Sequence, residues 1–198
     1  KQAPHCDFLG ELRKECDKQG VTFATSSHRA EHFWFLNGGR TVGYDNEVLD
    51  EKYRDFYGPA HNIHKINNLH NLLKQEHGIT PTKEWLEDWL VNSCELIDKY
   101  HPETLFFDWW VMNYAFRPYM KKFLAYYYNR SVEWGKEVCV QYKSDAIMYN
   151  VGIFDRERGQ LAATSPYIWQ SETSTAYNSW SYCTTNKFKT AGKIAGTF

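Results

Sequence analysis

Asp108 stands at the end of a short apolar segment and is followed directly by Trp109 and Trp110, in the run LFFDWW at 105–110. Such a segment is typical of a buried strand, which would present the carboxylate at its end beside two indoles. A strand-end aspartate more often caps a helix, but the paired tryptophans favour a chemical role. Sugar chemistry uses both groups, since apolar C–H faces pack on aromatic rings while a carboxylate attacks the anomeric carbon. The run therefore predicts chemistry on a sugar, with Asp108 as the nucleophile.

The composition disfavours a nucleic-acid-binding protein and a membrane span, but it does not by itself identify the function. Aromatic residues make up 17% of the 198 residues, which fits either a carbohydrate site or a core rich in tryptophan. The formal net charge of -1 lacks the basic excess of a nucleic-acid-binding protein. The apolar run at 104–115 is too short for a membrane span and is interrupted by Asp108. The five cysteines fit neither a zinc motif nor a disulfide framework, so we expect free thiols and no metal.

Strands are predicted to alternate with helices along the chain. The expected elements are helices at 7–19, 81–100 and 118–134 and strands at 21–27, 105–107, 137–142 and 166–170. This order is typical of βαβ units and a parallel sheet, whose functional residues lie at the carboxyl ends of the strands. The polar and aromatic stretch at 28–80 is too long for an ordinary connection, so we expect a functional loop insertion there.

Four segments carry a family resemblance. They are GVTFATSSHRAEH at 20–32, FFDWW at 106–110, DRERGQ at 155–160 and SWSY at 179–182. In this order they resemble bacterial α-L-fucosidases of glycoside hydrolase family 29, over nearly the whole chain. The resemblance implies an α/β fold of the (β/α)8 TIM-like barrel type and hydrolysis of terminal α-L-fucosyl linkages with retention, without a cofactor. It also implies that Asp108 is the nucleophile.

The proton donor is less closely specified, because its position differs between branches of the family. Glu157, expected in the loop after the strand at 137–142, matches the position used by some members, and we favour it. Other members place the donor directly after the tryptophan that matches Trp169, but this chain has Gln170 there, and an amide cannot deliver a proton. Glu172 is a nearby substitute, so the donor is a choice between Glu157 and Glu172.

Further substrate contacts follow from matched positions. His28 and Glu31 stand where the family contacts the sugar, and Trp110 provides an aromatic platform beside Asp108. Lys143 replaces an arginine found in other members and is still able to donate to a sugar hydroxyl, without bidentate geometry. Trp180 resembles the residue that lines the pocket for the fucose methyl group, although a core position is equally compatible with it.

The resemblance also bears on the extent of the chain. The paired-histidine motif of the family does not occur in it, so we expect residues 1–198 to be part of one barrel domain whose first and last strands lie outside this sequence. The implied partner is a fucosylated oligosaccharide or fucose-containing polysaccharide, with no nucleic acid and no membrane, and the oligomeric state stays open. The family further implies a periplasmic or secreted bacterial enzyme.

Two other functions stay open at this point. HRAEH at 28–32 matches the H-x-x-E-H pattern of zinc metallopeptidases, in which two histidines on one helical face bind zinc and the glutamate is the base. The β-prone run before it and the Asn-Gly-Gly turn signal after it disfavour the long helix that this mechanism needs. The aromatic residues could also serve a carbohydrate-binding protein without catalysis, but such modules are mostly β-sandwiches, and the strong helices speak against one.

Overall fold

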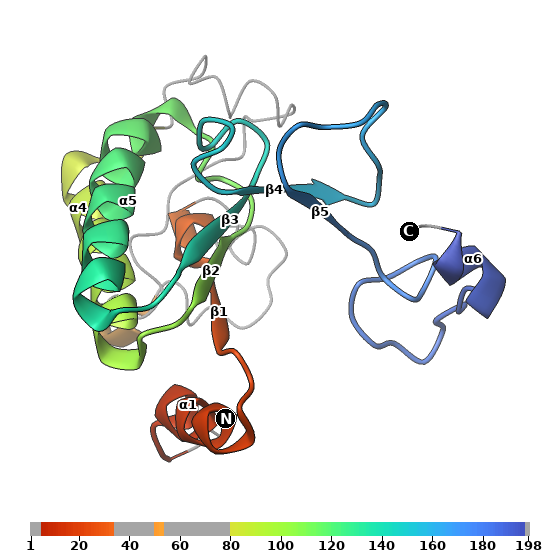
Figure 1. Cartoon of the computed structure of the whole chain (residues 1–198), viewed down its shortest axis with the longest axis horizontal. Helices are drawn as coiled ribbons and strands as arrows, with labels where there is room; N and C mark the ends of the chain where they lie inside the picture. The colour runs from red at the N-terminus through yellow and green to blue at the C-terminus, as the bar shows by residue number, and fades with distance from the viewer. Residues whose placement is uncertain (1–4, 34–49, 54–79, 197–198) are drawn as a thin grey trace.

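The computed structural model describes residues 5–33, 50–53 and 80–196 (Figure 1). Most of the loop insertion predicted at 28–80 lies outside these residues. The described parts of it are two short 3-10 helices, η1 (Arg29–Phe33) and η4 (Glu51–Tyr53). Within the described ranges, no helix combines the length and apolar character needed to cross a membrane.

Five strands form one sheet, in which every neighbouring pair is parallel and the strands follow one another in chain order. They are β1 (Ala24–Ser27), β2 (Thr104–Phe107), β3 (Cys139–Lys143), β4 (Ile153–Glu157) and β5 (Trp169–Glu172). The helices are α1 (Phe8–Gln19), α4 (Lys83–Tyr100), α5 (Arg117–Trp134) and the short α6 (Ala191–Ala195). The predicted α/β class with a parallel sheet is confirmed, and the sequential strand order is compatible with part of a TIM-like barrel.

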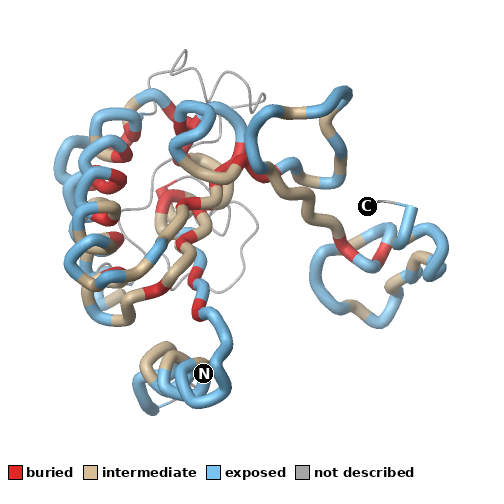
Figure 2. Tube along the Cα trace, viewed as in Figure 1, coloured by how far each residue is buried: buried red, intermediate tan, exposed pale blue. Residues whose placement is uncertain are grey.

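The hydrophobic core lies between the sheet and two helices. One face of the sheet buries Leu105, Phe107, Val140, Tyr142 and Phe154. α4 and α5 pack on this face, and their buried residues turn toward the strands (Figures 1 and 2). The rings of Trp89 in α4 and Phe123 in α5 lie 5.4 and 5.2 Å from that of Phe107. Burial of each such side chain contributes roughly 1.5–3 kcal/mol, so this core fixes the strand that ends at Asp108.

The boundaries of these helices have local causes. α4 begins after Thr82, whose side chain accepts a hydrogen bond from the Trp85 N–H at 3.3 Å, so the helix starts two residues after the predicted start at residue 81. α5 ends at Trp134 and is followed by Gly135, whose left-handed φ of 63° costs glycine little. The predicted ends of both helices, at residues 100 and 134, are confirmed.

β4 is the element that the sequence did not predict, because residues 145–165 read as a loop. The strand is short, and its apolar Phe154 alternates with charged side chains instead of forming the continuous apolar run of a buried parallel strand. Glu157 was expected in a loop, and this is corrected: it is the last residue of β4. The connections before and after β4 contain no helix, so only β1 to β3 are joined by helical crossovers.

Candidate active site

The second face of the sheet is polar and gathers charge toward the carboxyl ends of the strands. Lys143 pairs in register with Asp155, which pairs with Gln170, and one pleat further on Glu157 pairs with Glu172. Residues in register on parallel strands, and residues two apart on one strand, point to the same side of a sheet. These five side chains therefore share the face opposite α4 and α5.

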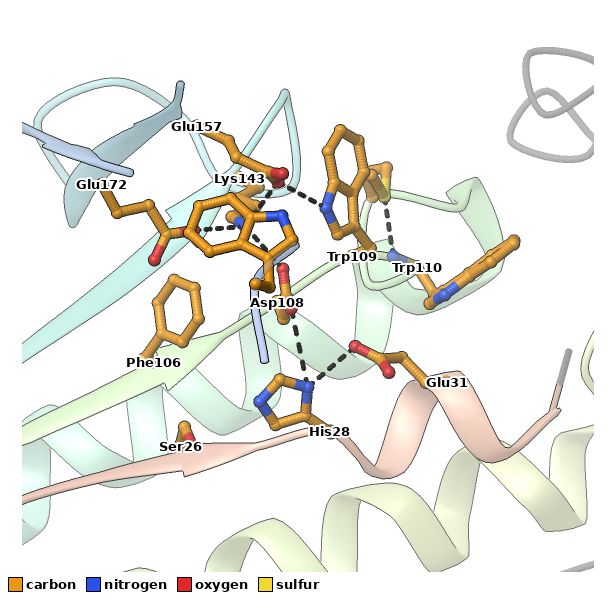
Figure 3. Close-up of a pocket in the computed structure, with 12 residues that line it drawn as sticks. Ser26, His28, Glu31, Phe106, Asp108, Trp109, Trp110, Lys143, Glu157 and Glu172 are labelled. Atoms are coloured by element: carbon orange, nitrogen blue, oxygen red, sulfur yellow. Dashed lines mark hydrogen bonds and ion pairs between the residues drawn. The ribbon is translucent and has the colours of Figure 1, made fainter. Parts of the chain in front are cut away.

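Asp108 joins this group from the end of β2. The turn that follows contains Trp110 with a φ of 81°, a left-handed conformation that is unfavourable for a bulky residue. The Trp110 N–H donates a hydrogen bond to the Met112 sulfur at 2.9 Å, which helps to hold this backbone. Strained residues of this kind concentrate at functional sites. The turn leaves the Asp108 carboxylate partly exposed and facing the strand ends (Figure 3).

Lys143 lies at the centre of the carboxylates. Its Nζ is 2.8 Å from Asp108 Oδ1, 2.8 Å from Glu157 Oε2 and 2.5 Å from Glu172 Oε1 (Figure 3). The side chain is only 5% exposed. Burial alone would lower the pKa of Lys143, but the hydrogen bonds to the three carboxylates outweigh it and raise that pKa above its usual value. Lys143 therefore stays charged and ties the three acids together.

Glu157 has a second donor besides Lys143. Its Oε2 accepts the indole N–H of Trp109 at 2.8 Å (Figure 3). Burial raises the pKa of Glu157, but the Lys143 and Trp109 hydrogen bonds outweigh burial and leave that pKa below its usual value. Glu157 is thus held as a carboxylate by these two donors. Since the bonded oxygens of Glu157 and Asp108 lie 2.8 Å from one nitrogen, they are no more than twice that distance apart.

His28 and Glu31 approach Asp108 from the opposite side. η1 turns the chain so that Glu31 Oε1 lies 2.8 Å from His28 Nδ1, and the same nitrogen is 3.6 Å from Asp108 Oδ2 (Figure 3). The Glu31 hydrogen bond is the main reason that the pKa of His28 is raised. The imidazole is therefore oriented between two carboxylates and presents its other nitrogen to the cavity.

These side chains line a pocket of about 680 Å³. Its lining comprises Ser26, His28, Glu31, Phe106, Asp108, Trp109, Trp110, Met112, Lys143, Glu157, Glu172 and Trp180. All eight site residues predicted from the sequence are among them. Carboxylates, an ammonium, an imidazole and several indoles thus meet in one cavity at the carboxyl ends of the strands, which is the composition expected of a sugar-processing site.

The sequence was then compared with known families. The family described as Alpha-L-fucosidase matches residues 1–198. The chain belongs to the α-L-fucosidase family. A comparison with curated proteins finds no match. The family membership identifies a glycoside hydrolase that acts on fucosyl linkages, and the suspected resemblance to glycoside hydrolase family 29 is confirmed.

The rival functions fit this fucosidase-family structure less well. The motif at 28–32 begins one residue before the five-residue 3-10 helix η1 (Arg29–Phe33) and does not lie on a long helix that would align both histidines. In the described part of the chain, the group whose potential ligand atoms lie within 4.8 Å of one another combines His28 and Glu31 with Asp108, not with His32. A parallel sheet covered by helices also differs from the β-sandwich of a typical carbohydrate-binding module.

Some residues of the fucosidase-family pocket were not predicted. Phe106 and Trp109 flank the ammonium of Lys143, each with a ring centroid 5.5 Å from its nitrogen. Both occur in the LFFDWW run, where Trp109 was noted as one of the two indoles beside Asp108 but neither residue was predicted as a site residue. Asp155 lies below the pocket with a fully buried side chain; it opens the DRERGQ segment, but no role was predicted for it because β4 was not predicted.

Replacement of the buried Lys143 tests how much its ammonium contributes to the stability of the fold. Lys143→Met leaves its carboxylates without their common partner, and we expect a loss of about 3 kcal/mol of unfolding free energy at pH 7. The loss should shrink near pH 4.5, because the carboxylates in the variant take up protons and their repulsion falls. Denaturant unfolding at both pH values measures it. The more exposed Lys136→Met, which removes the 3.2 Å contact with Glu103, should cost no more than about 1 kcal/mol. Equal losses for Lys143→Met at both pH values would contradict this account.

Proposed function

We propose that this protein is a retaining exo-α-L-fucosidase that works by double displacement. The observation that carries the proposal is the position of Lys143, which holds the Asp108 carboxylate close to two other carboxyl groups at the carboxyl ends of the strands. Retaining glycosidases separate their two carboxyl groups by roughly 5–5.5 Å, whereas inverting enzymes need about 6.5–9.5 Å. The upper limit set by the shared ammonium supports the retaining arrangement.

In the first step Asp108 attacks the anomeric carbon and forms a glycosyl ester, while the bond to the leaving oxygen breaks. Glu157 gives that oxygen a proton and later removes one from the water that cleaves the ester. Lys143 and Trp109 hold Glu157 as a carboxylate, so a bound sugar must raise its pKa by excluding water and by separating it from Lys143. Glu172, which also contacts Lys143 but has no indole donor among the residues that the structure describes, is the alternative acid.

The remaining pocket residues fit roles in binding the sugar. His28, fixed by Glu31, presents a ring nitrogen suited to a fucose hydroxyl. Trp110 and Trp180 provide apolar surface, on which the C–H face and the methyl group of fucose pack. The partner is therefore a fucosylated oligosaccharide or polysaccharide, and substrates of this kind favour a periplasmic or secreted location.

We also propose that the sheet is part of a (β/α)8 barrel, with residues 1–198 in one catalytic domain. The supporting features are the parallel strands in chain order, an apolar face under α4 and α5, and a polar face with the pocket at the carboxyl ends of the strands. Barrels place their active sites at this end.

Trapping the ester tests the proposed mechanism directly. A fucosyl fluoride with a second fluorine beside the anomeric centre should inactivate the protein in a time-dependent manner. The second fluorine slows both formation and hydrolysis of the ester, whereas the activated fluoride leaving group accelerates formation alone, so the ester accumulates. Mass spectrometry of a protease digest should find the added sugar on the peptide that contains Asp108. Labelling at another carboxylate, or product release with an inverted anomeric centre, would overturn the proposal.

A further inference from the structure

The ammonium group of Lys143 has fewer N–H donors than it has neighbouring carboxyl groups, so one of those groups receives no hydrogen bond from it. An ammonium group has three N–H donors, and Asp108, Glu157 and Glu172 lie within 2.8 Å of it. Asp155 Oδ2 is also near, at 3.9 Å, which is too far for a hydrogen bond. Asp155 is thus the fourth carboxyl group around a cation that has no fourth proton to give.

The surroundings of Asp155 offer little compensation. Its side chain is fully buried, and among the described residues neither of its oxygens has a hydrogen-bond partner of normal geometry. The polar groups that face it are Lys143 from β3, Gln170 and Glu172 from β5, and Glu157 two residues along its own strand. Gln170 compensates in part, since its interaction with Asp155 lowers the pKa of that carboxyl group, while its amide oxygen accepts a hydrogen bond from Gln141 at 2.7 Å.

An unpaired carboxylate in such a place is costly, and ordinary structures avoid it. Four carboxyl groups face one ammonium, so the cluster carries an excess of negative charge unless it also holds protons. Burial, together with the charge of Glu172, raises the pKa of Asp155 to about 6, although Gln170 and Lys143 oppose that rise. Asp155 therefore changes its charge in the pH range in which a glycosidase has to keep one acid protonated and one ionised.

We propose that Asp155 is a positioning residue. Its carboxylate competes with the carboxylates in the pocket for electrostatic attraction to the Lys143 ammonium, and it thereby sets the acidity of the carboxyl groups in the pocket. This inference rests on the proposed function, because the acidities that it concerns are those of Asp108 and the proton donor. Above pH 6 the ionised Asp155 adds negative charge beside the pocket and takes up part of the electrostatic attraction of the Lys143 ammonium. Both effects make the pocket carboxyl groups weaker acids, so the donor keeps its proton to a higher pH.

The test is the pH profile of Asp155→Asn, which keeps the shape of the side chain but cannot ionise. We expect the basic limb of the kcat/KM profile to move to lower pH by about half to one unit, since the full charge of Lys143 then acts on the other carboxylates, while the acidic limb, where Asp155 is already protonated and uncharged, should move much less. The substrate should be an alkyl α-L-fucoside, whose leaving group requires the acid. A profile that superimposes on that of the unaltered protein overturns the inference.

Asp98→Asn is the matched control. Asp98 lies on α4, where it accepts hydrogen bonds from Tyr126 and Arg130 away from the pocket. Its loss removes the same charge from the chain, so it should leave both limbs in place. A shift of the Asp98→Asn profile as large as that of Asp155→Asn would show an effect of net charge and would overturn the inference.

A second measurement keeps the inference testable if Asp155→Asn does not fold. The side-chain carboxyl carbon of Asp155 in otherwise unaltered protein, labelled with carbon-13, should titrate near pH 6. In Lys143→Gln its midpoint should rise. A midpoint near the ordinary aspartate value of about 3.9 would overturn the inference. Hydrolysis that does not depend on Asp108 would instead defeat the proposed function, so the two failures are distinguishable.

Discussion

Asp108→Ala is expected to lower kcat for fucoside hydrolysis by at least about 10³-fold, because no other group takes over attack on the anomeric carbon. The fold should persist, since the core under β2 is formed by Phe107, Trp89 and Phe123 and does not include the carboxylate. Steady-state rates on an aryl α-L-fucoside measure the loss. Added azide, a small nucleophile that fits the vacated space, should restore part of the rate and give a product of inverted anomeric configuration.

Asp145→Ala is the matched control for this loss. Asp145 also follows the end of a strand, but its carboxylate is 68% exposed and pairs with Arg117 at 2.9 Å outside the pocket. Its removal should leave kcat within about twofold of the unaltered rate, since an exposed ion pair contributes little. Near-normal turnover by Asp108→Ala would remove the basis of the catalytic assignment.

Glu157→Gln should slow the enzyme according to the leaving group. For an alkyl fucoside, whose departing oxygen needs a proton, we expect a loss of about 10²–10⁴-fold in kcat/KM. For a nitrophenyl fucoside, which departs without protonation, the loss in kcat/KM should be far smaller. The amide still accepts a hydrogen bond from Trp109, so the change tests the proton and not the shape of the site.

The same comparison with Glu172→Gln decides between the two candidate acids. If Glu157 is the donor, Glu172→Gln should lower both rates by a similar modest factor, through the loss of one contact with Lys143. Azide should accelerate the variant of the true donor and yield a product that retains its configuration. If only Glu172→Gln showed a larger loss on the alkyl fucoside than on the nitrophenyl fucoside, Glu172 would be the proton donor.

The sequence was most informative where one physical signal dominates. The stripe of α4 and the apolar runs of β2 and β3 predicted those elements because their buried faces need continuous or periodic apolar residues. The site was also predictable in its main members, since carboxylates and indoles at strand ends are uncommon in a core. All eight predicted residues line the pocket, and their individual roles remain predictions.

β4 shows where such prediction ends. A strand with Phe154 on one face and Asp155 and Glu157 on the other resembles a polar loop until its neighbours are known. The partners that make this pattern acceptable are Lys143 and Glu172, which come from other strands. Spacing along the chain cannot reveal them, so the buried Asp155 and its shared cation became visible only in three dimensions.

The crowding of acids around Lys143 also determines which small molecules the pocket should select. The ammonium of Lys143 lies among Asp108, Glu157 and Glu172 and offsets only part of their charge. A sugar analogue with a protonated ring nitrogen would bring a second cation to these acids and would resemble the positive charge that develops on the ring during reaction. Neutral sugars of the same shape gain no such attraction. Cationic inhibitors should therefore bind more tightly as the pocket acids ionise, and their affinity should weaken in acid.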